Sequence, residues 1–153
     1  MQDANFNDLV EPLTPIELTA PELDRLNYVV GKNYARCQLF EIPEYADFDR
    51  FPYFRVTANG VEYASDAMGQ GELSLLIMLW VLRDLKPNSI LVLEEPESHV
   101  SPRSQAALMN VIAEACSQKG LWVIVTTHSP TVVARIPREH YMEIGRASCR
   151  ERV

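Results

Sequence analysis

SILVLEEPE, at residues 89–97, is the most informative segment of this chain. Four consecutive apolar residues without polar alternation predict a strand that is buried on both faces of a parallel sheet. Such sheets place their chemistry at the carboxyl ends of strands, where Glu94 and Glu95 stand here. Adjacent carboxylates at that position suit the binding of Mg²⁺ and the activation of water. The stretch therefore indicates hydrolysis of a nucleotide.

Two local signals predict elements upstream of this strand. Thr19-Ala20-Pro21-Glu22 is typical of a capping box with proline early in a helix, so a helix is expected from about Pro21 towards Asn33. Residues 53–57 and 61–63 flank Asn59-Gly60, a pair that favours the tight turn of a β-hairpin.

Downstream, the pattern alternates between helix and strand, as in a parallel α/β sheet. A flexible approach over residues 65–72 leads to an apolar helix expected from about Leu73 to Leu85. Ser101 and Pro102 are suited to start a second helix, which Gly120 ends. A strand over 121–125, a short helix over 130–136 and a last strand at 141–143 are expected to follow.

The composition is that of one globular domain or part of one: 153 residues, 47% of them hydrophobic. A formal net charge of −7 and a pI near 4.9 argue against a broad nucleic-acid footprint. Three cysteines without CxxC spacing predict neither disulfides nor a zinc site, which favours a reducing cytoplasm. The longest apolar run, residues 73–82, is too short to span a bilayer, so no membrane segment is expected.

Three motifs carry a family resemblance. They are MGQGELSLL at residues 68–76, ILVLEEPESHVSP at residues 90–102 and VIVTTHSP at residues 123–130. From about residue 53 to 144 the chain resembles the ABC-type ATPases, and within them the stand-alone AAA-family ATPases related to the SMC, RecF and OLD proteins. The motifs look like that family's signature loop, its Walker B strand with the following D-loop, and its switch-histidine strand.

The resemblance implies ATP and Mg²⁺ as cofactors and assigns roles to single residues. Glu94 would stand on the metal side and act through a water of the Mg²⁺ shell, and Glu95 would polarise the attacking water. His128 would sense the γ-phosphate, and Ser98 would open the D-loop that crosses between subunits. Glu94 stands where aspartate is commoner in the family.

In such ATPases the signature loop binds ATP that is held by a second subunit, which implies a homodimer around two nucleotides. Gly69, Gln70 and Gly71 would present amides and a positive helix end to the phosphate, and Glu72 and Ser98 are expected to bind the cofactor as well. Gly69 stands where many members have serine, so only backbone donors remain at that position.

One essential part is missing from the sequence. GxxxxGK[ST] does not occur, and the only Gly-Lys pair is Gly31-Lys32. The expected fold is therefore an incomplete P-loop NTPase-like α/β sheet with flanking helices, preceded by a β-hairpin and lacking the Walker A lobe. The expected divisions are a remnant of a larger domain at 1–52, the ATPase part at 53–143, and a tail at 144–153 that resembles translated sequencing adapter.

Several functional hypotheses remain open. The first is an ATPase fragment whose dimeric parent drives a partner, an appended effector or a nuclease, in DNA processing or phage defence; this chain alone would be inactive, so its status as an enzyme stays uncertain. The second is an ATP-gated dimerisation switch that hydrolyses little, or a non-catalytic subunit completed by a partner. The third is a divalent-metal module built from five side chains: Glu94, Glu95, Glu97, His99 and His128.

Overall fold

The computed structural model describes residues 6–144, which form two separate sheets and the helices that join them. The antiparallel sheet has the order β1-β2-β3-β4, with β1 at Ile16–Glu17, β2 at Tyr34–Tyr45, β3 at Phe48–Ala58 and β4 at Val61–Ala64. The parallel pair consists of β5 at Ile90–Glu94 and β6 at Trp122–Thr126. The helices are α1 at Phe6–Val10, α2 at Ala20–Val30, α3 at Gln70–Asp84, α4 at Pro102–Lys119 and α5 at Pro130–Val133, with 3₁₀ turns at Ser65–Ala67 and Arg138–His140.

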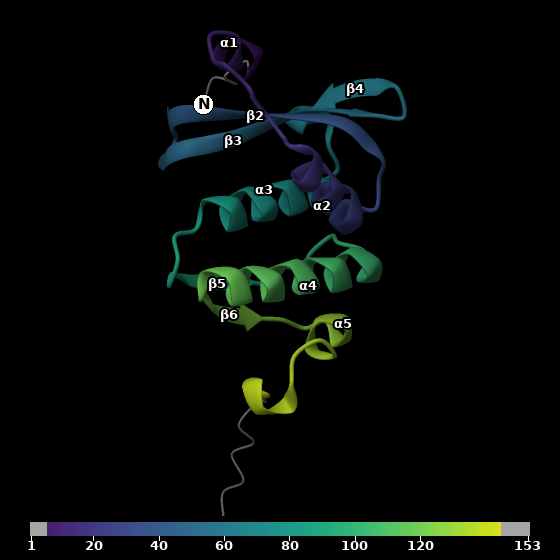
Figure 1. Cartoon of the computed structure of the whole chain (residues 1–153), viewed down its shortest axis with the longest axis vertical. Coiled ribbons are helices and arrows are strands. Elements are labelled where there is room, and N and C mark those ends of the chain that lie inside the picture. Colours follow the sequence, from purple (N-terminus) through teal and green to yellow (C-terminus); the bar gives the residue numbers. More distant parts are fainter. Residues whose placement is uncertain (1–5, 145–153) are drawn as a thin grey trace, which may run out of the picture.

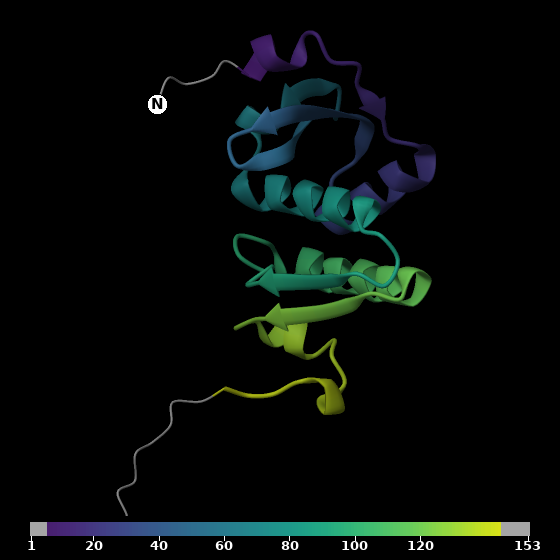
Figure 2. The same cartoon turned by 90° about the vertical axis from the view of Figure 1, so that its left-hand side faces the viewer.

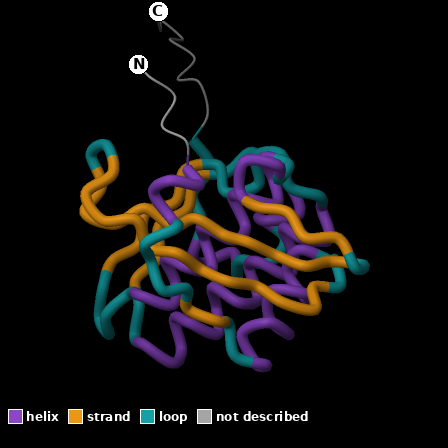
Figure 3. Tube along the Cα trace, turned by 90° about the horizontal axis from the view of Figure 1, so that it is seen from above, coloured by secondary structure: helices purple, strands orange, loops and turns teal. Residues whose placement is uncertain are grey.

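The elements stack in layers along the longest axis of the molecule (Figure 1). The antiparallel sheet lies at one end, α2 and α3 cover its inner face, and α4 with β5 and β6 forms the next layer (Figures 1 and 2). Seen from above, the strands run across the helices beneath them (Figure 3). The predicted parallel α/β arrangement is therefore confirmed for β5 and β6, while the other half of the chain is antiparallel.

The antiparallel sheet is larger than the hairpin predicted from the sequence. The turn at Asn59-Gly60 joins β3 to β4 as expected, with both residues at positive φ. The longest strand, β2, pairs with β3 over nearly its whole length, from Tyr34 opposite Ala58 to Tyr45 opposite Phe48. The predicted division at residue 52 falls inside β3, and that division stays a prediction.

Helix boundaries follow local capping chemistry. Thr19 and Glu22 form the predicted capping box of α2, and Ser101 and Gly120 bound α4 as predicted. The expected extension of α2 to Asn33 is wrong, because Gly31 takes the left-handed conformation and ends the helix at Val30.

Two other expected boundaries differ from the structure. Helix α3 begins at Gln70, three residues before the predicted Leu73, so the glycine-containing approach already forms its first turn. Residues 141–143 form no strand, and α5 ends at Val133 before the predicted limit of residue 136.

The core consists of three apolar clusters, and helix α3 contributes to two of them. Leu75 and Leu82 of α3 pack with α4, β5 and β6, whereas Leu76 packs with α2, β2 and β3. A helix that is apolar on several sides suits this position between two layers. A third cluster joins α1 to the outer face of β2 and β3. None of the helices within residues 6–144 is long and apolar enough to cross a membrane.

Only one face of the parallel pair is buried. Leu91 and Leu93 belong to the core, but four apolar side chains on the other face are exposed: Ile90 (68%), Val92 (65%), Trp122 (76%) and Ile124 (57%). The register places Ile90 opposite Trp122 and Val92 opposite Ile124, so these side chains form one continuous patch. The prediction of a strand buried on both faces is therefore wrong for this chain as it stands.

Candidate functional site

The carboxyl ends of β5 and β6 bring two predicted catalytic residues together. Glu94 pairs with Thr126 in register, and the amide of Glu95 donates to the Thr126 carbonyl at 2.9 Å, which extends the parallel ladder by one residue. Beyond it, Oε1 of Glu95 lies 3.2 Å from Nε2 of His128. Both side chains are open to solvent, with exposed fractions of 48% and 89%. A carboxylate and an imidazole thus meet at the edge where parallel sheets carry their chemistry.

The backbone after β5 turns sharply to aim Glu95. Glu95 and His99 have φ values of +44° and +61°, in a region that non-glycine residues rarely adopt. Two hydrogen bonds close the successive turns: Ser98 N–H donates to the Glu95 carbonyl, and Val100 N–H donates to the Glu97 carbonyl, each at 3.0 Å. The exposed Ser98 therefore lies in a tight turn beside Glu95. Such backbone geometry is often found at functional sites.

Glu94 lies on the exposed face of the parallel pair. Side chains alternate along a strand, so Glu94 shares its face with Ile90 and Val92 and is itself exposed. A single carboxylate next to the hydroxyl-bearing Thr126 offers hard oxygen donors, which fits Mg²⁺ that keeps most of its water shell. Glu94 could therefore contact, through water, a metal ion whose other ligands are phosphate oxygens and water molecules.

The predicted phosphate-binding residues form the N-terminus of α3. Gly69 is the N-cap and is exposed together with Gln70, so the first amides of the helix face solvent. Gly71 has a different environment, since a Cβ built on it would lie 2.1 Å from the carbonyl oxygen of His99. The start of α3 therefore packs directly on the turn that follows β5, and the absence of a side chain at Gly71 permits this contact.

Glu72, predicted as a cofactor-binding residue, points into the protein. Its carboxylate accepts hydrogen bonds from the hydroxyls of Tyr34 and Tyr63, both at 2.6 Å, and from the ammonium of Lys32 at 2.5 Å. Burial raises the pKa of Glu72, but these three donors outweigh burial and hold the pKa below its usual range. Glu72 thus ties the start of α3 to β2 and β4.

Glu97 makes hydrogen bonds that were not predicted from the sequence. Its Oε1 accepts from the Thr127 hydroxyl at 2.6 Å and from the amides of His128 and Ser129 at 2.8 and 3.1 Å. Its Oε2 is buried without a hydrogen-bond partner within the described residues. Burial raises the pKa of Glu97, but the hydrogen bonds from the Thr127 hydroxyl and the backbone amides lower the pKa by more than burial raises it. The carboxylate is therefore ionised at neutral pH. The only hint in the sequence was the hydroxyl residues of the TTHS segment, residues 126–129, which are suited to hydrogen bonding with a carboxylate.

These contacts do not support a preformed metal module. Within residues 6–144, no group of three or more His, Cys, Asp or Glu side chains comes together in a way that could hold a metal ion. Of the five residues proposed for the module, Glu97 is turned towards amides and a hydroxyl, and Glu95 lies beside His128. The third sequence-based hypothesis is therefore wrong in its original form.

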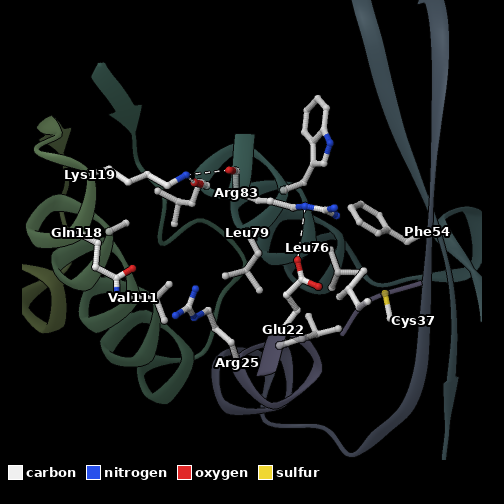
Figure 4. Close-up of a pocket in the computed structure, with 15 residues that line it drawn as sticks. Glu22, Arg25, Cys37, Phe54, Leu76, Leu79, Arg83, Val111, Gln118 and Lys119 are labelled. Carbon is white, nitrogen blue, oxygen red and sulfur yellow. Dashed lines mark hydrogen bonds and ion pairs between the residues drawn. The ribbon is translucent and has the colours of Figure 1, made fainter. Parts of the chain in front are cut away.

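A cavity of about 260 Å³ lies apart from this site, between α2, α3, α4 and the antiparallel sheet (Figure 4). Its walls are largely apolar, and none of the predicted site residues lines it. The cations at its rim already have partners, in the pairs Arg83–Glu22 and Arg25–Glu114 and between Lys119 and carbonyls at the end of α3.

The family comparison places this chain in the class of AAA-type ATPase domains. A family model described as "AAA domain, putative AbiEii toxin, Type IV TA system" matches residues 20–134, and the chain belongs to this family. No curated protein matches the chain.

Solved structures of SMC ATPase heads share the fold. The Smc head domain from Pyrococcus furiosus, described with an extended coiled coil and bound to the C-terminal domain of ScpA, has a TM-score of 0.53 at 15% identity. A structure titled for ATP-driven dimerisation and DNA-stimulated activation of SMC ATPases gives 0.51 at 13%, and an SmcHead bound to the C-winged helix domain of ScpA gives 0.53 at 18%. The matches cover 74%, 75% and 74% of this chain but only 28%, 69% and 35% of those chains. At such identities the likeness concerns the fold.

Proposed function

We propose that this chain forms the signature, Walker B and switch-histidine part of a Mg²⁺-dependent ATP-hydrolysing site that works in a nucleotide-bridged homodimer. The observation that carries the proposal is the 3.2 Å approach of Glu95 and His128 at the ends of adjacent parallel strands. Membership of an AAA-domain family agrees with it.

Each residue has a chemical role in this proposal. Glu95 is the exposed carboxylate that orients the attacking water and accepts its proton, and His128 donates a hydrogen bond to the γ-phosphate. Glu94 holds the metal through its water shell, and Mg²⁺ supplies neutralisation of the phosphate charge when bound. The amides of Gly69, Gln70 and Gly71 at the start of α3 bind the nucleotide of the opposite subunit.

The site requires a phosphate-binding loop that this sequence does not contain. The exposed apolar patch on β5 and β6 supports completion by a further lobe, because parallel sheets are normally covered on both faces. We propose that a lobe bearing GxxxxGK[ST] covers this patch, either on the same polypeptide or on a partner.

The descriptions of the matching family and structures support a proposal about a wider role. One SMC structure is described by ATP-driven dimerisation and DNA-stimulated activation, and the family description names a putative toxin. We propose that ATP-dependent dimerisation drives a partner protein, an appended effector or a nuclease, in phage defence or DNA processing in the cytoplasm.

The test is Glu95→Gln in the protein completed by its Walker A lobe. Glutamine keeps the size of the side chain but cannot accept the proton of water, so kcat should fall on the order of 10²-fold or more while ATP-bound dimers accumulate. Steady-state hydrolysis and size-exclusion chromatography with ATP measure both effects. Glu139→Gln, at an exposed position in the 3₁₀ turn Arg138–His140, is the matched control. Unchanged turnover in Glu95→Gln would remove Glu95 from the chemistry.

The alternative, an ATP-gated switch or a non-catalytic subunit, also has structural support. Gly69 and Gln70 leave their amides open to nucleotide independently of Glu95 and His128. Single-turnover hydrolysis decides between the two functions, because a switch would dimerise with ATP without converting it to ADP on the timescale of dimerisation.

A further inference from the structure

We infer, on the basis of the proposed function, that Glu97 is a positioning residue: it fastens the turn after β6 to the turn after β5 and thereby holds His128 beside Glu95. No role was assigned to Glu97 by the motif resemblance. Its carboxylate does not reach towards solvent at the site, but towards the backbone of the segment that carries His128.

One oxygen makes all three contacts. Oε1 of Glu97 receives the Thr127 hydroxyl and the two amides of His128 and Ser129, which are the three residues that follow β6. Hydrogen bonds to an ionised carboxylate are stronger than those between neutral groups. The peptide unit that sets the direction of the His128 side chain is therefore fixed from the opposite turn.

A second contact holds the same segment from α4. The Ser129 hydroxyl donates to Oε1 of Gln105 at 2.6 Å, and Nε2 of Gln105 donates to the Val100 carbonyl at 2.8 Å. Ser129 and Gln105 are each only 9% exposed. Gln105 thus anchors one side of the turn, and Glu97 anchors the side that contains His128.

His128 has no comparable support from its own side chain. Its imidazole is 89% exposed, and within the described residues its one polar side-chain contact is the 3.2 Å approach of Nε2 to Oε1 of Glu95. A side chain so open to solvent depends on its backbone for placement. Loss of the Glu97 contacts should therefore free His128 without unfolding the core.

Three substitutions separate the hydrogen bonds from the charge. Glu97→Gln retains an acceptor oxygen at the place of Oε1, Glu97→Asp shortens the reach by one methylene, and Glu97→Ala removes the acceptor. In the protein completed by its Walker A lobe, Glu97→Ala should lower kcat on the order of 10²-fold with KM for ATP changed less than about threefold, since misplacement of a catalytic group affects mainly the chemical step. Glu97→Gln should restore most of kcat, and Glu97→Asp should not.

Amide hydrogen exchange on the 153-residue chain tests the contacts without any need for hydrolysis. In Glu97→Ala the amide of His128 should exchange at least tenfold faster. The Ser129 amide should change less, because it also donates to the Thr127 hydroxyl at 3.0 Å. The amides within α4 should keep their protection and show that the variant is folded, and Glu97→Gln should keep the His128 amide protected. Glu139→Ala serves as a control for the loss of an exposed carboxylate.

The two measurements distinguish the possible failures. Slow exchange of the His128 amide in Glu97→Ala would overturn the contact itself. Fast exchange with wild-type kcat would overturn the positioning role. If the completed wild-type protein hydrolyses no ATP, the proposed function fails. The hydrogen-exchange result then still tests whether Glu97 contacts the His128 backbone.

Discussion

One carboxylate, that of Glu72, joins the start of α3 to β2, to β4 and to the residue between α2 and β2. Lys32 follows α2, Tyr34 begins β2 and Tyr63 lies in β4, and all three donate to Glu72 in the first turn of α3. The Glu72 side chain is only 9% exposed, so its desolvation is offset by these donors. Glu72 therefore fixes where the N-terminus of α3 lies.

The pKa of Glu72 gives a testable pH dependence. Because its pKa in the folded chain lies below the ordinary value of 4.5, its stabilisation is present above about pH 4.5 and is lost as pH falls through the lower folded-state pKa. We expect Glu72→Gln to reduce the free energy of unfolding by about 2 kcal/mol at pH 7 and by less at pH 3.5. Urea unfolding at both pH values measures this, with the exposed Glu62→Gln as the control. An equal loss at both pH values would contradict an ionised Glu72.

At the scale of elements, the contact of α3 with the turn after β5 connects two predicted parts of the site. Gly71 touches the His99 backbone, whereas Gly69, two residues earlier, has no atom within 4 Å of the place a Cβ would take. The same sequence motif therefore contains one glycine required by packing and one that leaves open space.

This difference predicts opposite outcomes for two similar substitutions. Gly71→Ala places a methyl group against backbone that cannot rotate away, and should cost about 1–3 kcal/mol of stability. Gly69→Ser adds an N-cap hydroxyl to α3 in open space, and should gain a few tenths of a kcal/mol. Thermal unfolding of both variants measures the effect. A Gly71→Ala variant as stable as the wild type would show that α3 and the turn do not pack this closely.

The parts of the fold that depend on neighbouring residues could be predicted from the sequence. The capping box at Thr19, the Asn59-Gly60 turn and the α4 caps need only neighbouring residues, and the sequence identified them. The strand β2 was missed because its pairing partner, β3, follows a turn without a glycine signal. The inward direction of Glu72 and the contacts of Glu97 depend on residues about 30 to 40 positions away, which no local pattern shows.

At the scale of the whole molecule, the exposed face of β5 and β6 is the largest departure from an ordinary parallel sheet. Trp122 is 76% exposed on this face, so a substitution there removes little burial from the chain alone. If a Walker A lobe covers the patch, the same side chain becomes buried, and its burial is worth about 2 kcal/mol. The stability effect of one substitution should thus depend on whether the lobe is present.

Trp122→Arg tests this dependence directly. We expect the melting temperature of the 153-residue chain to change little, and the completed protein to lose about 2 kcal/mol or more, because a charge would then be buried without a partner. Val61→Arg, at a position 61% exposed on β4 and far from the patch in the layer order, is the control that should be tolerated in both forms. If Trp122→Arg were equally neutral in the completed protein, the lobe would have to dock elsewhere, and Glu94 on the same face would then be separated from the phosphates.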